Sequence, residues 1–402
     1  MAPALNLPSD REGVLPNQLL SDAISAGVIA ADSDIPEANL QPASLDLRLG
    51  EVAHRIRCSF LPDTEPVARK AKAFIEDTFS LTGEGVLLEP ERPYLIPLKE
   101  RLRLPPNVRA KGNPKSSTGR IDVFTRIITD RSYRFDEIEA GYEGELYLEV
   151  VPLSFPVRVR EDLTLNQVRL SVGRADLTDD EVREHHSRVP LLYENGQPIP
   201  ADELALSNGM FLGLDLRGDK DGRVGYRARE HAPALDLTKD GAVPPAPYWE
   251  EVHREEADRV VLSPRKFYLL MSNEAVSIPP DLAAEMTAYD PTSGELRTHY
   301  AGFFDPGFGF ARGGGSHGAR AALEVRAHDV PFSIENGQRV CKLTFERMLA
   351  EPTIFYGDSG QGSSYQRQTD ALGKHFLRST PEPKGKKMAA AGDELPFGTE
   401  EP

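Results

Sequence analysis

One short polar stretch of the sequence, NPKSSTGRID from residue 113, has the residue types that bind an anion. The adjacent hydroxyls of Ser116 and Ser117 can donate directed hydrogen bonds. Arg120 offers a planar pair of donors, and Lys115 adds a second cation. Together these groups could surround a phosphate. The same composition is ordinary in a solvated turn, because Ser, Thr and Gly are common loop residues, so the ten residues alone leave both interpretations open.

The composition favours a two-domain protein with a small anionic ligand. The 402 residues exceed one typical domain, and 39% apolar residues are enough for substantial cores. A net charge of -16 argues against nucleic-acid binding through general electrostatics, so a polyanion would have to meet a local cationic pocket.

The start of the chain and its cysteines indicate the compartment. Cys58 and Cys341 cannot form a disulfide framework, and no basic segment leads into an apolar signal core. No apolar run reaches the roughly 20 residues needed to span a bilayer. We therefore expect a cytoplasmic protein with no membrane partner and no nucleic-acid partner.

The chain contains a long internal repeat. VLLEPERPYLIPLKERLRLPP from residue 86 is similar to VVLSPRKFYLLMSNEAVSIPP from residue 260, with Tyr94 matching Tyr268. Farther along, Glu149 and Glu324 each stand in the string LEV at almost the same offset. The period is far longer than that of a solenoid, so the pattern indicates duplication of a whole domain.

The local patterns predict mainly β-structure. Short alternating apolar stretches separated by Pro and Gly favour antiparallel strands in each half. One helix is expected near the start, where Leu19, Ala23 and Ile24 recur at helical spacing between Pro16 and Gly27.

The repeat and the composition also suggest domain limits. We expect the first domain at residues 1–195 and the second at 204–378, with the link near residues 193–203. Residues 379–402 are rich in Pro, Gly and charge, which is typical of an unfolded tail.

Four strings together resemble a known family. QPASLDLRLG follows the expected helix, KSSTGR begins at residue 115, AGFFDPGFG precedes ALEV, and GSSYQRQTDALGKHF lies near the C-terminus. Their order and spacing resemble the dCTP deaminases, relatives of the trimeric dUTP diphosphatases, over both halves of the chain. The resemblance implies tandem dUTPase-like domains, each a distorted β-barrel or jelly roll with a few short helices. It also implies a trimer-based homo-oligomer that converts dCTP to dUTP and ammonia, supplying dUTP for thymidylate synthesis.

The resemblance assigns the polar string to the nucleotide. In the family the SSxxR string holds the triphosphate and a serine orients the reacting water, roles that fall on Ser116, Ser117 and Arg120. Lys115 replaces the usual arginine. Mg²⁺ is expected to arrive with the triphosphate and to keep several waters, so no all-protein metal cage is expected.

Deamination also needs a proton carrier. A carboxylate can take a proton from the attacking water and return it to the leaving ammonia. The zinc-dependent cytidine deaminases use H-x-E and P-C-x-x-C strings, which two isolated cysteines cannot supply, so we expect a zinc-free reaction. The family's glutamate corresponds to Glu149 in the first half and Glu324 in the second.

The two halves have diverged in complementary ways. The first keeps KSSTGR but has a longer hairpin, whereas the second keeps AGFFDPGFG but has YDPTSGE in place of the phosphate string. A composite site would join the string containing Ser116 to Ala301, Asp305 and Glu324. In the alternative, Glu149 is catalytic beside the string of its own half and the second half is scaffold.

The C-terminal string is expected to close over the nucleotide. Tyr365 and Gln368 match the family's tyrosine and glutamine, whereas Ser364 replaces its lysine and removes one charge. A lid of this kind would exclude water and strengthen polar contacts within the site.

Other functions stay open at this point. A dUTP diphosphatase could use Asp305 to activate water, and a bifunctional enzyme would carry dCTP to dUMP. A catalytically dead nucleotide-binding regulator is the third alternative. dTTP and dUTP are candidate inhibitors.

Overall fold

The computed structural model describes residues 5–8, 10–288, 296–298, 302–312, 317–327, 329–358, 365–366, 368 and 370–377. Only the backbone is described for residues 288 and 296–298. Ala301, Ser364 and the expected tail at residues 379–402 lie outside the described residues.

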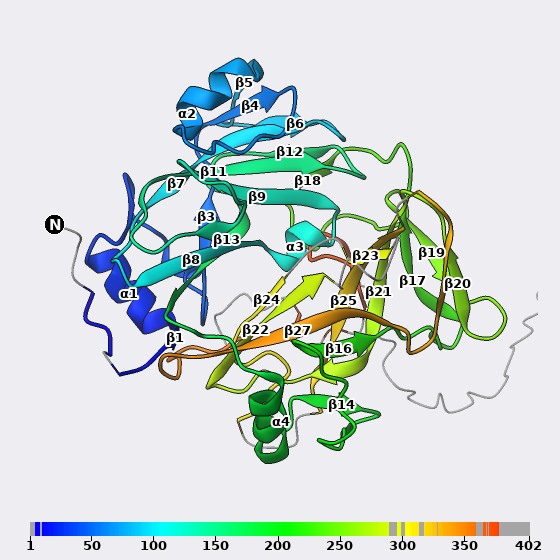
Figure 1. The fold of residues 1–402 in the computed structure, drawn as a ribbon. Helices are drawn as coiled ribbons and strands as arrows, with labels where there is room; N and C mark the ends of the chain where they lie inside the picture. Colours follow the sequence, from blue (N-terminus) through cyan, green and yellow to red (C-terminus); the bar gives the residue numbers. More distant parts are fainter. Residues whose placement is uncertain are drawn as a thin grey trace, which may run out of the picture.

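The described chain is mainly β, which confirms the expected fold class (Figure 1). The expected first helix is confirmed as α1, Asn17–Ser25, which buries Leu20 and Ala23. The other described helices are short: α2 (Val67–Lys70), α3 (Ser116–Gly119), α4 (Asp179–Arg188) and the 3₁₀ turns Glu37–Asn39 and Ala71–Ala73. None of the described helices is long and apolar enough to cross a membrane.

The first half contains two antiparallel sheets. One has the strand order β1-β13-β8-β10 with β3 also on β13, and the other has β5-β4-β7-β11-β9 with β2 also on β7. The strands of the first sheet are β1 (Gly13–Val14), β3 (Leu45–Arg48), β8 (Val108–Pro114), β10 (Glu137–Ile138) and β13 (Thr164–Val172). Those of the second are β2 (Ile29–Ala31), β4 (Val52–Ile56), β5 (Ile75–Ser80), β7 (Tyr94–Arg103), β9 (Val123–Thr129) and β11 (Glu143–Pro152).

The second half repeats this arrangement. One sheet has the order β16-β27-β22-β24, and the other has β15-β14-β21-β17-β19 with β25 pairing β21 and β23. The strands of the first are β16 (Met210–Gly213), β22 (Leu282–Ala288), β24 (Gly302–Phe304) and β27 (Arg339–Arg347). Those of the second are β14 (Leu192–Glu194), β15 (Gln197–Pro198), β17 (Arg223–Ala228), β19 (Trp249–His253), β21 (Phe267–Val276), β23 (Leu296–Thr298) and β25 (Ala319–Ala327).

The strand registers reproduce the internal repeat. β11 pairs with β7 and β9 in the first half, as β25 pairs with β21 and β23 in the second. Glu149 lies opposite Leu95 and Glu324 lies opposite Leu269, each one residue beyond the matching tyrosine. The two glutamates therefore occupy the same place in two copies of one strand arrangement.

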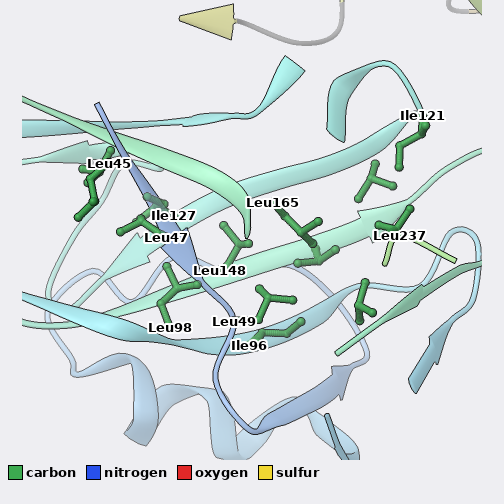
Figure 2. Packing of buried hydrophobic residues seen from close by; sticks show 14 of the residues in the cluster. Leu45, Leu47, Leu49, Ile96, Leu98, Ile121, Ile127, Leu148, Leu165 and Leu237 are labelled. Carbon is green, nitrogen blue, oxygen red and sulfur yellow. The ribbon is translucent and has the colours of Figure 1, made fainter. Parts of the chain in front are cut away.

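Apolar side chains at alternate positions of the strands form the hydrophobic cores. Leu45, Leu47 and Leu49 are spaced by two residues, so they point to one face and pack against the leucines and isoleucines of β7, β9 and β11 (Figure 2). Leu237 of the second half reaches the same cluster. A second cluster, which includes Tyr268, fills the second half.

Short strands join the halves. β18 (Leu235–Asp236) of the second half pairs in parallel with β12 (Val157–Val159) of the first, which in turn pairs with β6 (Val86–Leu88). The counterparts of β6 and β12, β20 (Arg259–Leu262) and β26 (Phe332–Glu335), form a sheet of their own. The segment at 193–203 that was expected as the link contributes β14 and β15 to the sheet of the second half.

A buried ion pair should be important for the first half. Arg48 Nε on β3 lies 2.6 Å from Glu100 Oε1 on β7, and both side chains are buried. Arg48→Ala would leave an unpaired buried carboxyl, so it should lower the free energy of unfolding by about 3 kcal/mol. Arg101→Ala, which breaks an exposed pair with Asp32, should cost less than about 1 kcal/mol. Urea unfolding measures both losses, and equal losses would contradict the expectation.

Candidate functional site

A cleft between the two halves has two connected parts, each enclosing about 600 Å³ of space with the open mouth included. The inner part is the more enclosed. Its polar lining includes Ser116, Gly119, Arg120, Asp305, Glu324 and Gln368. The outer part is defined by Asp46, Lys115, Ser116, Ser117, Tyr365 and Lys374. The structure thus brings the polar string of the first half together with the hairpin, the glutamate and the C-terminal string of the second.

The polar string forms α3, a single helical turn. β8 ends at Pro114, which has no N–H to continue a sheet ladder. The N–H groups of Thr118 and Gly119 then donate to the Lys115 carbonyl at 2.8 and 3.0 Å, closing the turn. The turn lies against β24, at the junction of the halves (Figure 1). The string is therefore a turn, as one interpretation of the sequence had it. Because this turn lines the cleft, it is also placed where it could bind an anion.

Glu324 reaches the cleft because Gly119 has no side chain. A Cβ at residue 119 would lie 2.9 Å from Glu324 Oε1, closer than side-chain carbons normally approach. Asp122, just after α3, forms a buried ion pair with Arg326, two residues beyond Glu324 on β25. This pair holds the turn against the strand that carries the glutamate.

The Glu324 carboxyl is held in its neutral form near pH 7. Its pKa is raised to about 8, mainly because the group is buried; the Arg120 charge opposes this shift and the Asp122 charge adds to it. Within the described part of the chain, no hydrogen bond or ion pair engages this carboxyl. Among the residues described, Glu324 therefore faces the cleft without a competing partner, and its neutral carboxyl has a proton to donate.

Glu149 has the opposite surroundings. Its Oε1 lies 2.5 Å from Arg126 Nη2, and the Phe135 ring covers that guanidinium with its centroid 3.7 Å away. Glu149 is fully buried and, among the described residues, lines neither part of the cleft. In the first half, the glutamate that matches Glu324 is thus engaged in an ion pair with Arg126.

Arg120 lies in the inner part of the cleft, beside Glu324. Its Nη2 donates to Gln368 Oε1 at 2.6 Å, its Nη1 donates to the Ala371 carbonyl at 3.2 Å, and the guanidinium stacks 3.7 Å from the centroid of the Tyr365 ring. These contacts place the C-terminal string directly over α3. They engage one N–H of each terminal nitrogen, and the charge of Arg120 acts on the neighbouring Glu324 carboxyl.

Asp305 is held by an ion pair across the halves. Its Oδ1 lies 2.9 Å from Nη2 of Arg169 on β13, and Nη1 of the same guanidinium lies 2.5 Å from Glu346 Oε2. Burial raises the pKa of Asp305, and Arg169 opposes that shift. The Ser44 hydroxyl donates to the other oxygen, Oδ2, at 3.3 Å. Asp305 is therefore engaged on both oxygens.

The described residues offer no ready metal cluster. Cys58 is exposed and Cys341 is buried, and both are free. Among the described residues, no group of three or more His, Cys, Asp and Glu side chains is placed to hold a metal ion.

Comparison with known proteins gives the family. Models of the N-terminal and C-terminal domains of 2'-deoxycytidine 5'-triphosphate deaminase match residues 11–174 and 178–376. The crystal structure of the 2'-deoxycytidine 5'-triphosphate deaminase from Agrobacterium tumefaciens is 41% identical, with a TM-score of 0.78 over 84% of this chain and 99% of that chain. The chain belongs to the dCTP deaminase family.

Curated members of the dCTP deaminase family are more distant. The dCTP deaminase of Natronomonas pharaonis is 28% identical over 158 residues, which cover 37% of this chain and 78% of the relative. The dUMP-forming dCTP deaminase of Methanobrevibacter smithii is 30% identical over 126 residues, which cover 31% of this chain and 60% of the relative. Each of these alignments therefore covers less than half of this duplicated chain.

The sequence analysis did not identify three residues that contact the cleft, its carboxylates or the matching glutamate of the first half. Arg126 meets Glu149 only because β9 and β11 pair in this register. Lys374 reaches the outer part of the cleft through the path of the C-terminal segment. Arg169 did leave a signal, because it is the lone charged residue in the strand TLNQVRLSV, where a buried charge needs partners.

The pH dependence of unfolding should distinguish the two glutamates. Because the pKa of Glu324 is raised from 4.5 to about 8 in the folded protein, the folded state binds more protons between these values. Its contribution is therefore most favourable below pH 4.5 and is lost as the pH rises to about 8. Glu324→Gln removes this loss, so the variant should gain stability relative to the unaltered protein as the pH rises.

Glu149→Gln is the matched control. It should lower the free energy of unfolding by about 1 to 3 kcal/mol at pH 7, because Arg126 loses its buried charge partner. Urea unfolding at pH 5 and pH 8.5 measures both effects. A Glu324→Gln difference that does not change with pH would contradict the expected pKa.

Proposed function

We propose that this chain catalyses the hydrolytic deamination of dCTP to dUTP and ammonia. The observation that carries the proposal is the neutral Glu324 carboxyl, which has no partner among the described side chains and faces a cleft that Ser116 also lines. Membership of the dCTP deaminase family supports the choice of substrate. Glu324 is the catalytic acid and base of this proposal, and Glu149 is a structural residue.

The two parts of the cleft suit the two ends of the nucleotide. The inner part has apolar walls from Met286, Phe303 and Phe304, which suit a pyrimidine base. The outer part offers the Ser117 hydroxyl and two lysines, which suit phosphate oxygens. We therefore place the base beside Glu324 and the triphosphate in the outer part, where Mg²⁺ enters as part of the chelated substrate.

A single carboxyl, that of Glu324, can carry every proton that the reaction moves. Glu324 gives its proton to ring N3 of cytosine, which makes C4 more electrophilic. Water oriented by Ser116 bonds to C4 and returns a proton to the Glu324 carboxylate. That proton passes to the exocyclic amine, the C4–N bond breaks and ammonia leaves. Loss of the C4 hydroxyl proton to Glu324 gives the uracil carbonyl and restores the acid, so a pKa near the working pH suits every step.

Arg120 supports this cycle through charge. Each time Glu324 loses its proton, a carboxylate forms in a buried setting, and the adjacent guanidinium stabilises it. Arg120 also donates hydrogen bonds to Gln368 and the Ala371 carbonyl. The charge that stabilises the Glu324 carboxylate is therefore held in place by the C-terminal string.

An assay with two substrates tests the proposal. The purified protein is incubated with Mg²⁺ and either dCTP or dUTP, and ammonia and pyrophosphate are measured. Ammonia from dCTP without pyrophosphate supports the proposal, and equal amounts of both would identify dUMP as the product. Pyrophosphate from dUTP alone would indicate a diphosphatase, and no product from either would indicate a regulator. Activity should also survive dialysis against a zinc chelator once Mg²⁺ is restored.

Exchange of each glutamate should separate their roles. Glu324→Gln should reduce kcat by about 10² to 10⁴, because an amide cannot accept and return a proton at neutral pH. dCTP binding should be retained. Glu149→Gln should keep most of its rate, measured at a temperature where both variants are folded. A dead Glu149→Gln enzyme beside an active Glu324→Gln enzyme would assign catalysis to the first half.

A methyl group at α3 should act as a second probe. Gly119→Ala would place Cβ against the Glu324 carboxyl, so kcat should fall by about tenfold or more. Gly373→Ala is a matched control near the same turn, because its Cβ would lie 3.6 Å from Arg120 Cβ, an ordinary contact. Steady-state ammonia release measures both, and equal rates in the two variants would show that Glu324 does not depend on the gap at residue 119.

A further inference from the structure

The outer part of the cleft contains a lysine that has no assigned role. Lys374 lines this part together with Lys115, Ser116 and Ser117. It lies on the C-terminal segment, well after the Tyr365 and Gln368 string, and its positive charge acts on the buried Asp46 beside Lys115.

Among the described residues that line the outer part, Lys374 is the cation that is not held by a buried carboxylate. Asp46 is paired with Lys115, whose ammonium also donates to Thr164 at 2.8 Å, and Asp305 is paired with Arg169. These pairs involve buried carboxylates, so breaking them would leave an uncompensated charge. Lys374 differs because its resting partner lies on the surface of the protein.

That partner is Asp240. Lys374 Nζ lies 2.9 Å from Asp240 Oδ2, with the side chains 32% and 57% exposed. A pair of this exposure contributes little to stability, because water competes for both charges. His375 Nδ1 lies 3.3 Å from the other oxygen of Asp240, so the carboxylate keeps a polar neighbour if Lys374 moves away.

The backbone at Lys374 is fixed independently of its side chain. Its N–H donates to the Tyr365 hydroxyl at 3.1 Å. Phe376 is buried in an aromatic cluster, with its ring centroid 5.4 Å from that of Tyr248 and 5.9 Å from that of Trp249. The lysine side chain can therefore exchange partners while the segment stays in place.

We propose that Lys374 leaves Asp240 and binds the terminal phosphates of the nucleoside triphosphate, making it a binding residue supplied by the C-terminal segment. The inference rests on the proposed function, because it takes the outer part of the cleft as the triphosphate site. A triphosphate offers several negative charges to one ammonium, which outweighs a single half-exposed carboxylate. Occupation of the site would thereby tie α3 and the C-terminal segment to the same ligand.

Calorimetric titration with Mg²⁺ and either dCTP or dCMP tests the proposal, with Glu324→Gln present in every protein compared so that dCTP is bound but not converted. Lys374→Ala should weaken dCTP binding by about tenfold and leave dCMP binding unchanged, because only the triphosphate reaches this lysine. Lys374→Arg should retain most of the dCTP affinity. Equal weakening of both ligands, or no weakening of dCTP, would overturn the inference.

Two further variants exclude a structural explanation. Lys239→Ala removes a similar exposed pair, in which Nζ lies 3.2 Å from Asp236 Oδ2, and should leave both affinities unchanged. Asp240→Asn should bind dCTP at least as tightly as the unaltered protein, because Lys374 is released. Tenfold weaker dCTP binding in Asp240→Asn would show that the pair itself is needed and would overturn the inference.

The outcomes separate this inference from the proposed function. If the unaltered protein releases ammonia from dCTP and Lys374→Ala binds dCTP normally, the inference fails and the function stands. If the unaltered protein releases no ammonia but binds dCTP in a manner that depends on Lys374, the function fails and the triphosphate contact stands.

Discussion

The buried ion pair between Asp122 and Arg326 sets the geometry on which the cleft depends. Asp122 follows α3 in the first half, and Arg326 lies on β25 in the second, so this ion pair forms only when the halves are docked. Truncating one partner while the halves stay docked would leave the other charge without its ion-pair partner in a largely buried setting, which is more costly than the loss of a surface pair. Docking in this position places Gly119 against Glu324. Because glycine has no side chain, the Glu324 carboxyl fits beside its backbone.

Duplication explains why the two glutamates can differ so strongly. Both stand at the same register in matching sheets, yet one is paired with Arg126 and the other faces the cleft between the two halves. The first copy has a longer hairpin, and the second has a different sequence in place of the polar string. The chemistry that we propose is thereby concentrated at one junction instead of being repeated in each half.

Much of the fold was accessible from the sequence because it depends on local patterns. The spacing of Leu19, Ala23 and Ile24 predicted α1, and the match of Tyr94 with Tyr268 predicted two copies of one sheet arrangement. The gathering of Ser116, Asp305 and Glu324 around one cleft followed from the complementary strings. What could not be predicted depends on pairing between distant segments.

Arg120 is the clearest example of that limit. Its place in the SSxxR string suggested a phosphate contact, which stays a prediction, whereas its contacts with Gln368 and the Ala371 carbonyl, groups about 250 residues away, left no signal in that string. The Arg126 pair with Glu149 depends likewise on strand register. Side-chain partners of this kind arise from tertiary packing, which no short string records.

The parallel pairing of β12 with β18 has a consequence for the behaviour of the cleft in dilute solution. This pairing and the peptide chain fasten the first half to the second, so the encounter of the two cleft walls is intramolecular. An intramolecular encounter is governed by the effective concentration that the tether imposes, independent of how much protein is present. The surfaces that meet at Gly119 and Glu324 therefore stay matched at any dilution, and no collision between separate copies is required to bring them together.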